Sequence, residues 1–170
     1  TSFLWMLWLW CMGVGPSKTD GVPLITEMMM EDKALLDQIG GRPVLEKVHK
    51  VFYDKIYEHP WLKKYFLHIE QKLIENQQTD FMVSNMGGGK IYSGALPKNG
   101  HKHMFITEEL FEVRAKLLED SLKECNVSDE HISRWLRIDG AFKKSLVKVS
   151  PADCEKRFFT DDILNFPKPN

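Results

Sequence analysis

The sequence predicts an all-α fold, and three observations support this prediction. Across residues 31–150 apolar residues recur at helical spacing, and no stretch alternates apolar and polar residues as a half-buried strand does. The prolines of this region, Pro43, Pro60 and Pro97, fall at the ends of the apolar periods, where a helix tolerates them. Glycine pairs and a glycine triplet separate the periods, which indicates several helices joined by sharp turns.

Length and composition fit one globular domain that does not bind nucleic acid. The chain has 170 residues, enough for a single core, and its 23 basic residues nearly balance 24 acidic ones. No basic stripe with interleaved aromatic residues is present, which excludes binding by phosphate neutralisation. Cys11, Cys125 and Cys154 lie far apart, so neither a zinc site nor a redox pair is indicated. We expect an arm and linker at 1–30, the helical domain at 31–150, and an extension at 151–170.

The expected arm differs sharply from the rest of the chain. Residues 3–15, FLWMLWLWCMGVG, carry no charge and three tryptophans. A helix of this length rises only about 20 Å, short of the roughly 30 Å hydrocarbon core of a bilayer. The segment therefore cannot span a membrane alone. Tryptophan favours the membrane interface, which predicts an interfacial anchor or an arm buried in a partner protein. A targeting remnant or a fusion scar is the other interpretation.

A glycine pair joins the first two predicted helices. The first, residues 31–39, ends at Gly40 and Gly41, which can adopt positive φ and turn the chain. Pro43 begins the second helix, and Pro60 ends it. The apolar face of the second helix contains Val44, Val48, Val51, Phe52 and Ile56.

Three further helices are predicted after the second. The first of them covers about residues 68–86 and stops at the glycine triplet 87–89. Thr107 caps the next, which ends near Cys125, and Ser128 caps the last. The last helix is expected to run to residue 149 with one buried stripe, formed by Ile132, Trp135, Leu136, Phe142, Leu146 and Val149.

Some polar residues are predicted to face the apolar interior. Gln78 lies four residues after Ile74 and three before Phe81, so it shares their helix face. Tyr53 is also predicted to place its hydroxyl at the interior, because it directly follows a core phenylalanine. A buried amide without a partner costs about 1 to 3 kcal/mol. A buried prosthetic group needs this arrangement, in which two donors face an apolar interior and a histidine arrives from another segment.

Five motifs follow one another along the chain. They are IGG at 39–41, FYDKI at 52–56, HPWLKKYF at 59–66, GGG…YSG at 87–94 and GHKHMFIT at 100–107. These motifs make the chain similar to the truncated, two-on-two haemoglobins, most closely their group I members, and the spacing between the motifs also fits the family pattern without a gap. The resemblance covers about residues 35–149 and implies a two-on-two helical sandwich around a haem.

The resemblance implies that His101 is the proximal ligand of a haem b iron. One imidazole ligand leaves the sixth iron position open for a diatomic gas. Tyr53 and Gln78 match the family's distal residues, which donate hydrogen bonds to the gas, and Gln77 is a further candidate. His103 does not match the ligand position and is expected to be exposed on a polar turn.

Other haem contacts also follow from the resemblance. Phe66 matches the phenylalanine that packs on the haem face. Ile74 stands where many globins carry a polar distal residue, and Phe81 lies on the same helix face. Lys98 and Lys102 flank the proximal segment and are candidates to pair with the haem propionates.

The function implied by the resemblance is oxygen binding and transport, with NO and CO as related ligands. Family chemistry also includes the reaction of bound O₂ with NO to give nitrate. That turnover needs an external reductase, because the chain has no flavin or nicotinamide motif, so whether the protein is an enzyme stays open. The alternative is an accessory or structural subunit of a membrane-bound complex that keeps the globin fold, with or without haem. An intracellular location is expected, at a mitochondrial or other inner membrane through residues 3–15, or else in the cytoplasm.

Overall fold

The computed structural model describes residues 34–169. The predicted arm and linker at 1–30 therefore lie outside the described residues. Within residues 34–169 no helix has the length and apolar character needed to cross a membrane.

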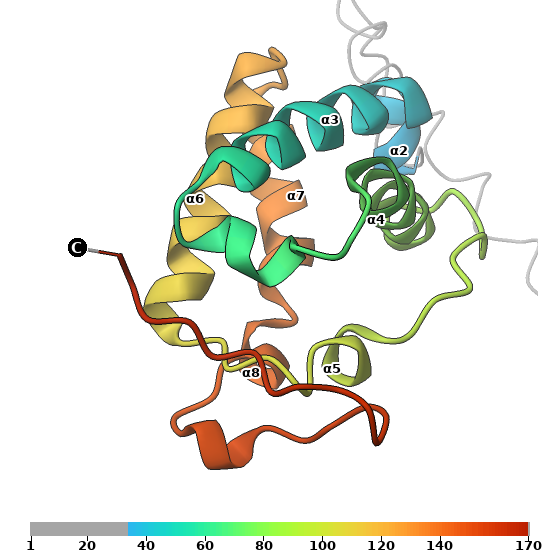
Figure 1. The fold of residues 1–170 in the computed structure, drawn as a ribbon. Helices are drawn as coiled ribbons and strands as arrows, with labels where there is room; N and C mark the ends of the chain where they lie inside the picture. Colours follow the sequence, from blue (N-terminus) through green and yellow to red (C-terminus); the bar gives the residue numbers. More distant parts are fainter. Residues whose placement is uncertain (1–33, 170) are drawn as a thin grey trace, which may run out of the picture. The chain divides into compact units, whose positions relative to one another are not determined.

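The described part of the chain is helical, and the all-α prediction is confirmed (Figure 1). Over these residues the β-structure is limited to two isolated bridges, Met104 with Leu164 and Ile106 with Val147. The helices are α2 (Leu35–Ile39), α3 (Arg42–Glu58), η1 (Leu62–Phe66), α4 (Gln71–Asn85), α5 (Pro97–Gly100), α6 (Glu108–Glu124), α7 (Asp129–Gly140), α8 (Lys143–Leu146) and η2 (Pro151–Asp153).

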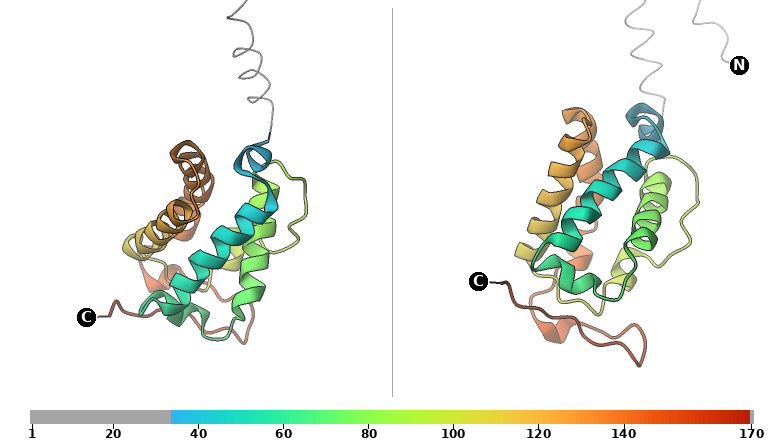
Figure 2. Two further views of the ribbon diagram at one scale, coloured as in Figure 1. Left: turned by 90° about the horizontal axis from the view of Figure 1, so that it is seen from above. Right: turned by 45° about the horizontal axis from the view of Figure 1, so that its top comes forward.

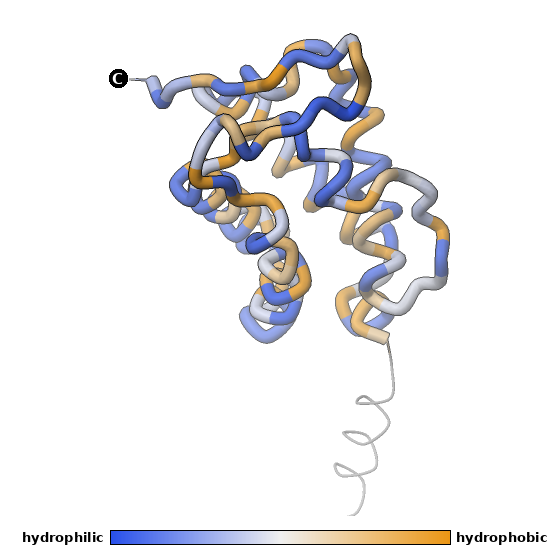
Figure 3. Tube along the Cα trace, turned by 90° about the horizontal axis from the view of Figure 1, so that it is seen from below, coloured by the Kyte–Doolittle hydropathy of each residue, from blue (hydrophilic) through white to orange (hydrophobic). Residues whose placement is uncertain are grey.

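Four long helices form two packed pairs. α3 packs against α4, α6 packs against α7, and α3 also packs against α6, so the two pairs meet through α3 and α6 (Figure 2). Along each helix hydrophobic residues recur between hydrophilic ones (Figure 3), as a one-sided apolar face requires. The apolar faces meet in one core that includes Leu45, Val48, Phe52, Met82, Val83, Leu118, Leu122 and Trp135. This is the predicted two-on-two arrangement.

The predicted helix ends are confirmed where capping chemistry defines them. Gly40 and Gly41 have φ of 105° and 75°, the left-handed values that glycine tolerates, and they turn the chain from α2 into α3. The Thr107 hydroxyl accepts a hydrogen bond from a free N–H in the first turn of α6, that of Leu110, at 3.1 Å. Ser128 accepts in the same way at the start of α7.

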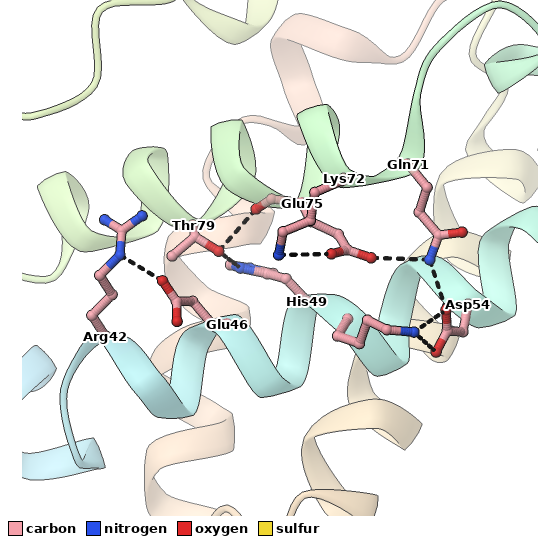
Figure 4. A network of polar contacts seen from close by, with 9 residues as sticks. Arg42, Glu46, His49, Asp54, Gln71, Lys72, Glu75 and Thr79 are labelled. Atoms are coloured by element: carbon pink, nitrogen blue, oxygen red, sulfur yellow. Dashed lines mark hydrogen bonds and ion pairs between the residues drawn. The ribbon is translucent and has the colours of Figure 1, made fainter.

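A buried polar network ties α3 to α4 (Figure 4). The Thr79 hydroxyl donates to the Glu75 backbone oxygen at 2.8 Å, and Thr79 Oγ1 lies 2.8 Å from His49 Nδ1. Because the hydroxyl proton is already used, His49 Nδ1 must donate to that oxygen. The amide of Gln71 donates to Asp54 at 2.7 Å and to Glu75 at 3.0 Å. These bonds fix the register of α4 on α3.

The last predicted helix is wrong in its extent. The helix stops at Gly140, and a separate short helix, α8, follows. Val147 then bridges Ile106, and the Lys148 N–H donates to the Ile106 carbonyl at 2.9 Å, so the chain becomes extended. Val149, expected in the buried stripe, is 95% exposed. Pairing with the segment before α6 replaces the last helical turn.

The C-terminal segment packs on the helices rather than projecting from them. Leu164 exchanges backbone hydrogen bonds with His103 and Phe105, at 2.9 and 2.8 Å. The Trp61 indole donates to the Phe166 carbonyl at 2.8 Å, and the ring of Phe166 stands at 89° to that of Tyr65. Figure 1 shows this segment running alongside the chain between α5 and α6. The segment therefore covers the side of the fold next to His101.

Candidate functional site

One cavity brings together seven of the residues predicted to form the site. Its volume is about 500 Å³, and residues of α3, η1, α4, α5, α6, α7 and α8 line it. Lys98 and Lys102 are not among the described residues that line it. The predicted site residues that do line it are Tyr53, Phe66, Ile74, Gln77, Gln78, Phe81 and His101.

His101 is held in the form that a metal ligand needs. It caps the short helix α5, which begins at Pro97, and its Nδ1 lies 2.8 Å from the Pro97 carbonyl oxygen. Because a carbonyl only accepts, Nδ1 carries the proton and the lone pair remains on Nε2. Burial lowers the pKa of His101, and the nearby cations Arg114 and Lys148 add to this effect, while the bond to Pro97 opposes it. The imidazole is therefore neutral at neutral pH.

An ion at His101 would need other ligands than protein side chains. Within residues 34–169, no group of three or more His, Cys, Asp or Glu side chains is placed to hold a metal ion. A ligand of the haem type brings four ring nitrogens of its own and a large apolar surface. The cavity volume and the many aromatic and aliphatic residues that line it fit such a group.

Tyr53 offers an unused donor to the cavity. Its side chain is 4% exposed, and its ring packs edge-on against Phe52 and Phe66 at 5.0 and 6.0 Å. Its hydroxyl makes no hydrogen bond within residues 34–169, and burial raises the pKa of the phenol above its usual value. Tyr53 therefore keeps its proton and can donate it to a ligand in the cavity.

α4 supplies the other polar residues that line the cavity. Gln78 is partly buried and Gln77 is exposed, and neither side chain has a hydrogen-bond partner among the described residues. Ile74 lies one turn before Gln78, as the sequence predicts, and contributes an apolar surface. Phe81 lies nearly one turn after Gln78 and packs against Tyr92 at 5.2 Å. The helix thus presents two amides between apolar neighbours.

The cavity also contains a partly buried ion pair that the sequence analysis missed. Arg114 of α6 donates to Asp139 of α7, and its guanidinium lies 5.1 Å from the centre of the Phe52 ring. Burial works against the charge of Arg114, but the charge of Asp139 outweighs it and raises the pKa of Arg114. A single sequence contains no signal that would pair two residues on separate helices. Other missed lining residues are Tyr65, Tyr92, Met104, Phe111, Phe142 and Arg157.

The expectation that His103 is exposed is wrong. Its side chain is only 4% exposed, because residues near Leu164 pair with its backbone and cover it. Its Nδ1 has no hydrogen-bond partner in the described part of the chain. His103 does not line the cavity at His101, but a second hollow beside the C-terminal segment.

Comparison with known proteins gives one consistent result. The model of the family described as bacterial-like globin matches residues 34–146. The group 1 truncated hemoglobin of Tetrahymena thermophila is 26% identical over 110 residues, which are 65% of this chain and 91% of that protein.

Solved structures with the same fold include two truncated globins. The crystal structure of truncated hemoglobin from Tetrahymena pyriformis in the Fe(III) form has a TM-score of 0.64 at 24% identity, over 68% of this chain and 98% of that one. The 2/2 hemoglobin from Synechococcus, in the cyanomet state and with covalently attached heme, has a TM-score of 0.61 at 23% identity, over 65% of this chain and 94% of that one. The predicted two-on-two fold is therefore confirmed.

Proposed function

Since this chain belongs to the bacterial-like globin family, and the curated relatives that it matches are group 1 truncated hemoglobins, we propose that it binds haem b through His101 and takes up O₂, NO or CO. The observation that carries the proposal is the single cavity in which the free Nε2 of His101 and the unused donors Tyr53 and Gln78 occur together. Haem would supply an iron that can take up a diatomic gas.

His101 is proposed to hold the iron, and its surroundings support this role. The bond from Nδ1 to the Pro97 carbonyl fixes the ring orientation and increases the basicity of Nε2. The Lys148 ammonium donates to the carbonyls of His101 and Met104 at 3.2 and 2.7 Å, which ties down the segment that carries the ligand. Because the His101 side chain and its backbone are held in this way, His101 would lose little conformational entropy on coordinating the iron.

Tyr53 and Gln78 are proposed to donate hydrogen bonds to the bound gas. The Tetrahymena pyriformis protein has been solved as three separate single variants, one with a tyrosine changed and two with a glutamine changed. The sequence separations of those three residues equal those of Tyr53, Ile74 and Gln78 here. In this alignment by spacing, Ile74 replaces the first glutamine. Because this chain has one donor fewer, the stability of the bound gas should depend more strongly on the hydrogen bonds from Tyr53 and Gln78.

An absorption spectrum tests the proposal. The purified full chain loaded with haem should show an intense Soret band, and its ferrous form should bind CO. His101→Ala should lose haem or change the ferrous spectrum, and added imidazole should restore it. His131→Ala, at the start of α7 and outside the cavity, is the control and should match the parent chain. The absence of a Soret band in the parent chain, or an unchanged ferrous spectrum in His101→Ala, would contradict the proposal.

A further inference from the structure

The carboxylates of a bound haem need either water or a cation. Among the described residues that line the cavity, Arg114 and Arg157 are the permanent cations. Arg114 is already paired with Asp139, and the two side chains are only 24% and 9% exposed. A carboxylate drawn to Arg114 would lose most of its hydration and would lie beside the Asp139 carboxylate, which is costly where so little water reaches. This leaves Arg157 as the cation available to a haem carboxylate.

Arg157 stands where the cavity meets the C-terminal segment. It lines both the cavity of His101 and a second hollow of about 490 Å³, and Tyr65, Ile69 and Met104 also line both. Its side chain is 37% exposed, so it lies at the wet edge of the cavity and not in its interior. This is the kind of edge at which charged groups of an otherwise apolar ligand remain solvated.

Arg157 is held in place but keeps unused donors. Its Nε donates to Asp161 Oδ2 at 2.9 Å, and Nη2 donates to Oδ1 at 3.3 Å. Asp161 also accepts the backbone N–H groups of Arg157 and Phe158, at 3.0 and 3.2 Å. Nη1 makes no hydrogen bond to any residue that the structure describes. A guanidinium has five N–H donors, so it can bind Asp161 and a second carboxylate together.

We propose that Arg157 is a haem-binding residue, whose guanidinium is positioned by Asp161 and pairs with a haem propionate at the edge of the cavity. The inference rests on the proposed haem binding and makes the C-terminal segment part of the haem site. In this role Arg157 replaces the two lysines that flank His101 in the sequence. Lys98 and Lys102 do not line the cavity, and the Lys102 ammonium lies 3.6 Å from Glu155 of the C-terminal segment.

The rate of haem loss from the full chain tests this inference. Ferric protein would be mixed with excess apomyoglobin, and haem transfer would be followed by absorbance. Arg157→Gln should release protohaem about fivefold faster than the parent chain, the effect of a partly exposed ion pair. Arg157→Lys should recover most of this difference. Lys102→Gln removes a cation nearer in sequence to His101 and should leave the rate within twofold.

Protohaem dimethyl ester separates propionate pairing from a loss of local structure, because its side chains carry no charge. With this ester the parent chain and Arg157→Gln should release the group at equal rates. Asp161→Asn breaks the same ion pair but keeps the cation, and should accelerate protohaem loss less than Arg157→Gln does. The inference is overturned if Arg157→Gln matches the parent chain with protohaem, if its effect persists with the ester, or if Asp161→Asn loses haem equally fast. Failure of haem binding itself would show earlier, as a missing Soret band in every variant.

Discussion

His49 should make the folded chain sensitive to mild acid. The side chain lies on α3 with no exposed surface, and its Nδ1 donates to Thr79. Nε2 is buried without a hydrogen-bond partner within the described residues. The ring of Trp135 stands edge-on to it at 5.5 Å and offers no acceptor. A proton on Nε2 would therefore create a buried cation with nothing to compensate it.

The size of the effect follows from the pKa of the imidazole. Burial, with a smaller contribution from the charge of Arg114, lowers the pKa of His49 from 6.5 to about 3. The unfolded chain takes up a proton on this residue as the pH falls through about 6.5, whereas the folded chain does not until about pH 3. The stability that His49 contributes above pH 6.5 is therefore lost on acidification. By linkage the loss between pH 7 and pH 5 is about 2 kcal/mol.

Urea unfolding of the haem-free chain and of His49→Gln, followed by circular dichroism at pH 7, 6 and 5, measures this loss. Glutamine keeps a donor for Thr79 but does not titrate. The free energy of unfolding should fall by about 2 kcal/mol more in the parent chain than in the variant. His101 and His103, whose pKa values burial also lowers, are present in both proteins, so their contributions cancel. His131→Gln should behave like the parent chain. Parallel pH profiles for the parent chain and His49→Gln would refute the reasoning.

Two further predictions concern the gas and the fold. Tyr53→Phe should raise the O₂ dissociation rate roughly fivefold to tenfold at unchanged haem content, because one hydrogen bond is lost; flash photolysis measures this rate. Tyr57→Phe is the matched control, because that hydroxyl donates to Ile69 at 2.6 Å and does not line the cavity. Gly40→Ala should lower the free energy of unfolding by about 1 to 3 kcal/mol in urea, because φ is 105° there and the added Cβ would lie 2.8 Å from Val44 Cγ2. Gly140→Ala adds a Cβ that meets nothing and should not destabilise the chain.

The helices could be predicted because they depend on local patterns, and seven of the residues that line the cavity could be predicted because the motifs resemble those of a known family. Apolar periodicity and capping residues such as Thr107 define each helix within a few residues of sequence. Once the motifs are in register, the positions of Tyr53, Gln78 and His101 follow from the fold that they imply. The structure places all three residues in one cavity.

The failures share a different cause, which is contact between segments distant in sequence. His103 has polar neighbours and reads as exposed, but residues near Leu164 bury it. Val149 continues the helical period of the sequence, but Val147 bridges Ile106, so the chain is already extended before it reaches Val149. Arg157 lies far from His101 in sequence, yet both line the same cavity. No periodicity or spacing encodes such contacts.

The ion pair between Arg114 and Asp139 explains why an apolar ligand would enter the cavity in one orientation. Burial, with a smaller contribution from the charge of Arg114, lowers the pKa of His101 and so helps to keep the proposed iron ligand unprotonated. The pairing of Arg114 with Asp139 leaves this pair without net charge, which weakens the attraction of Arg114 for a second carboxylate. At the outer edge Arg157 keeps donors free beyond those that Asp161 uses. If Arg157 pairs with a haem propionate as proposed, we expect the carboxylates of a bound haem to lie at this outer edge and its apolar edge to lie deeper in the cavity.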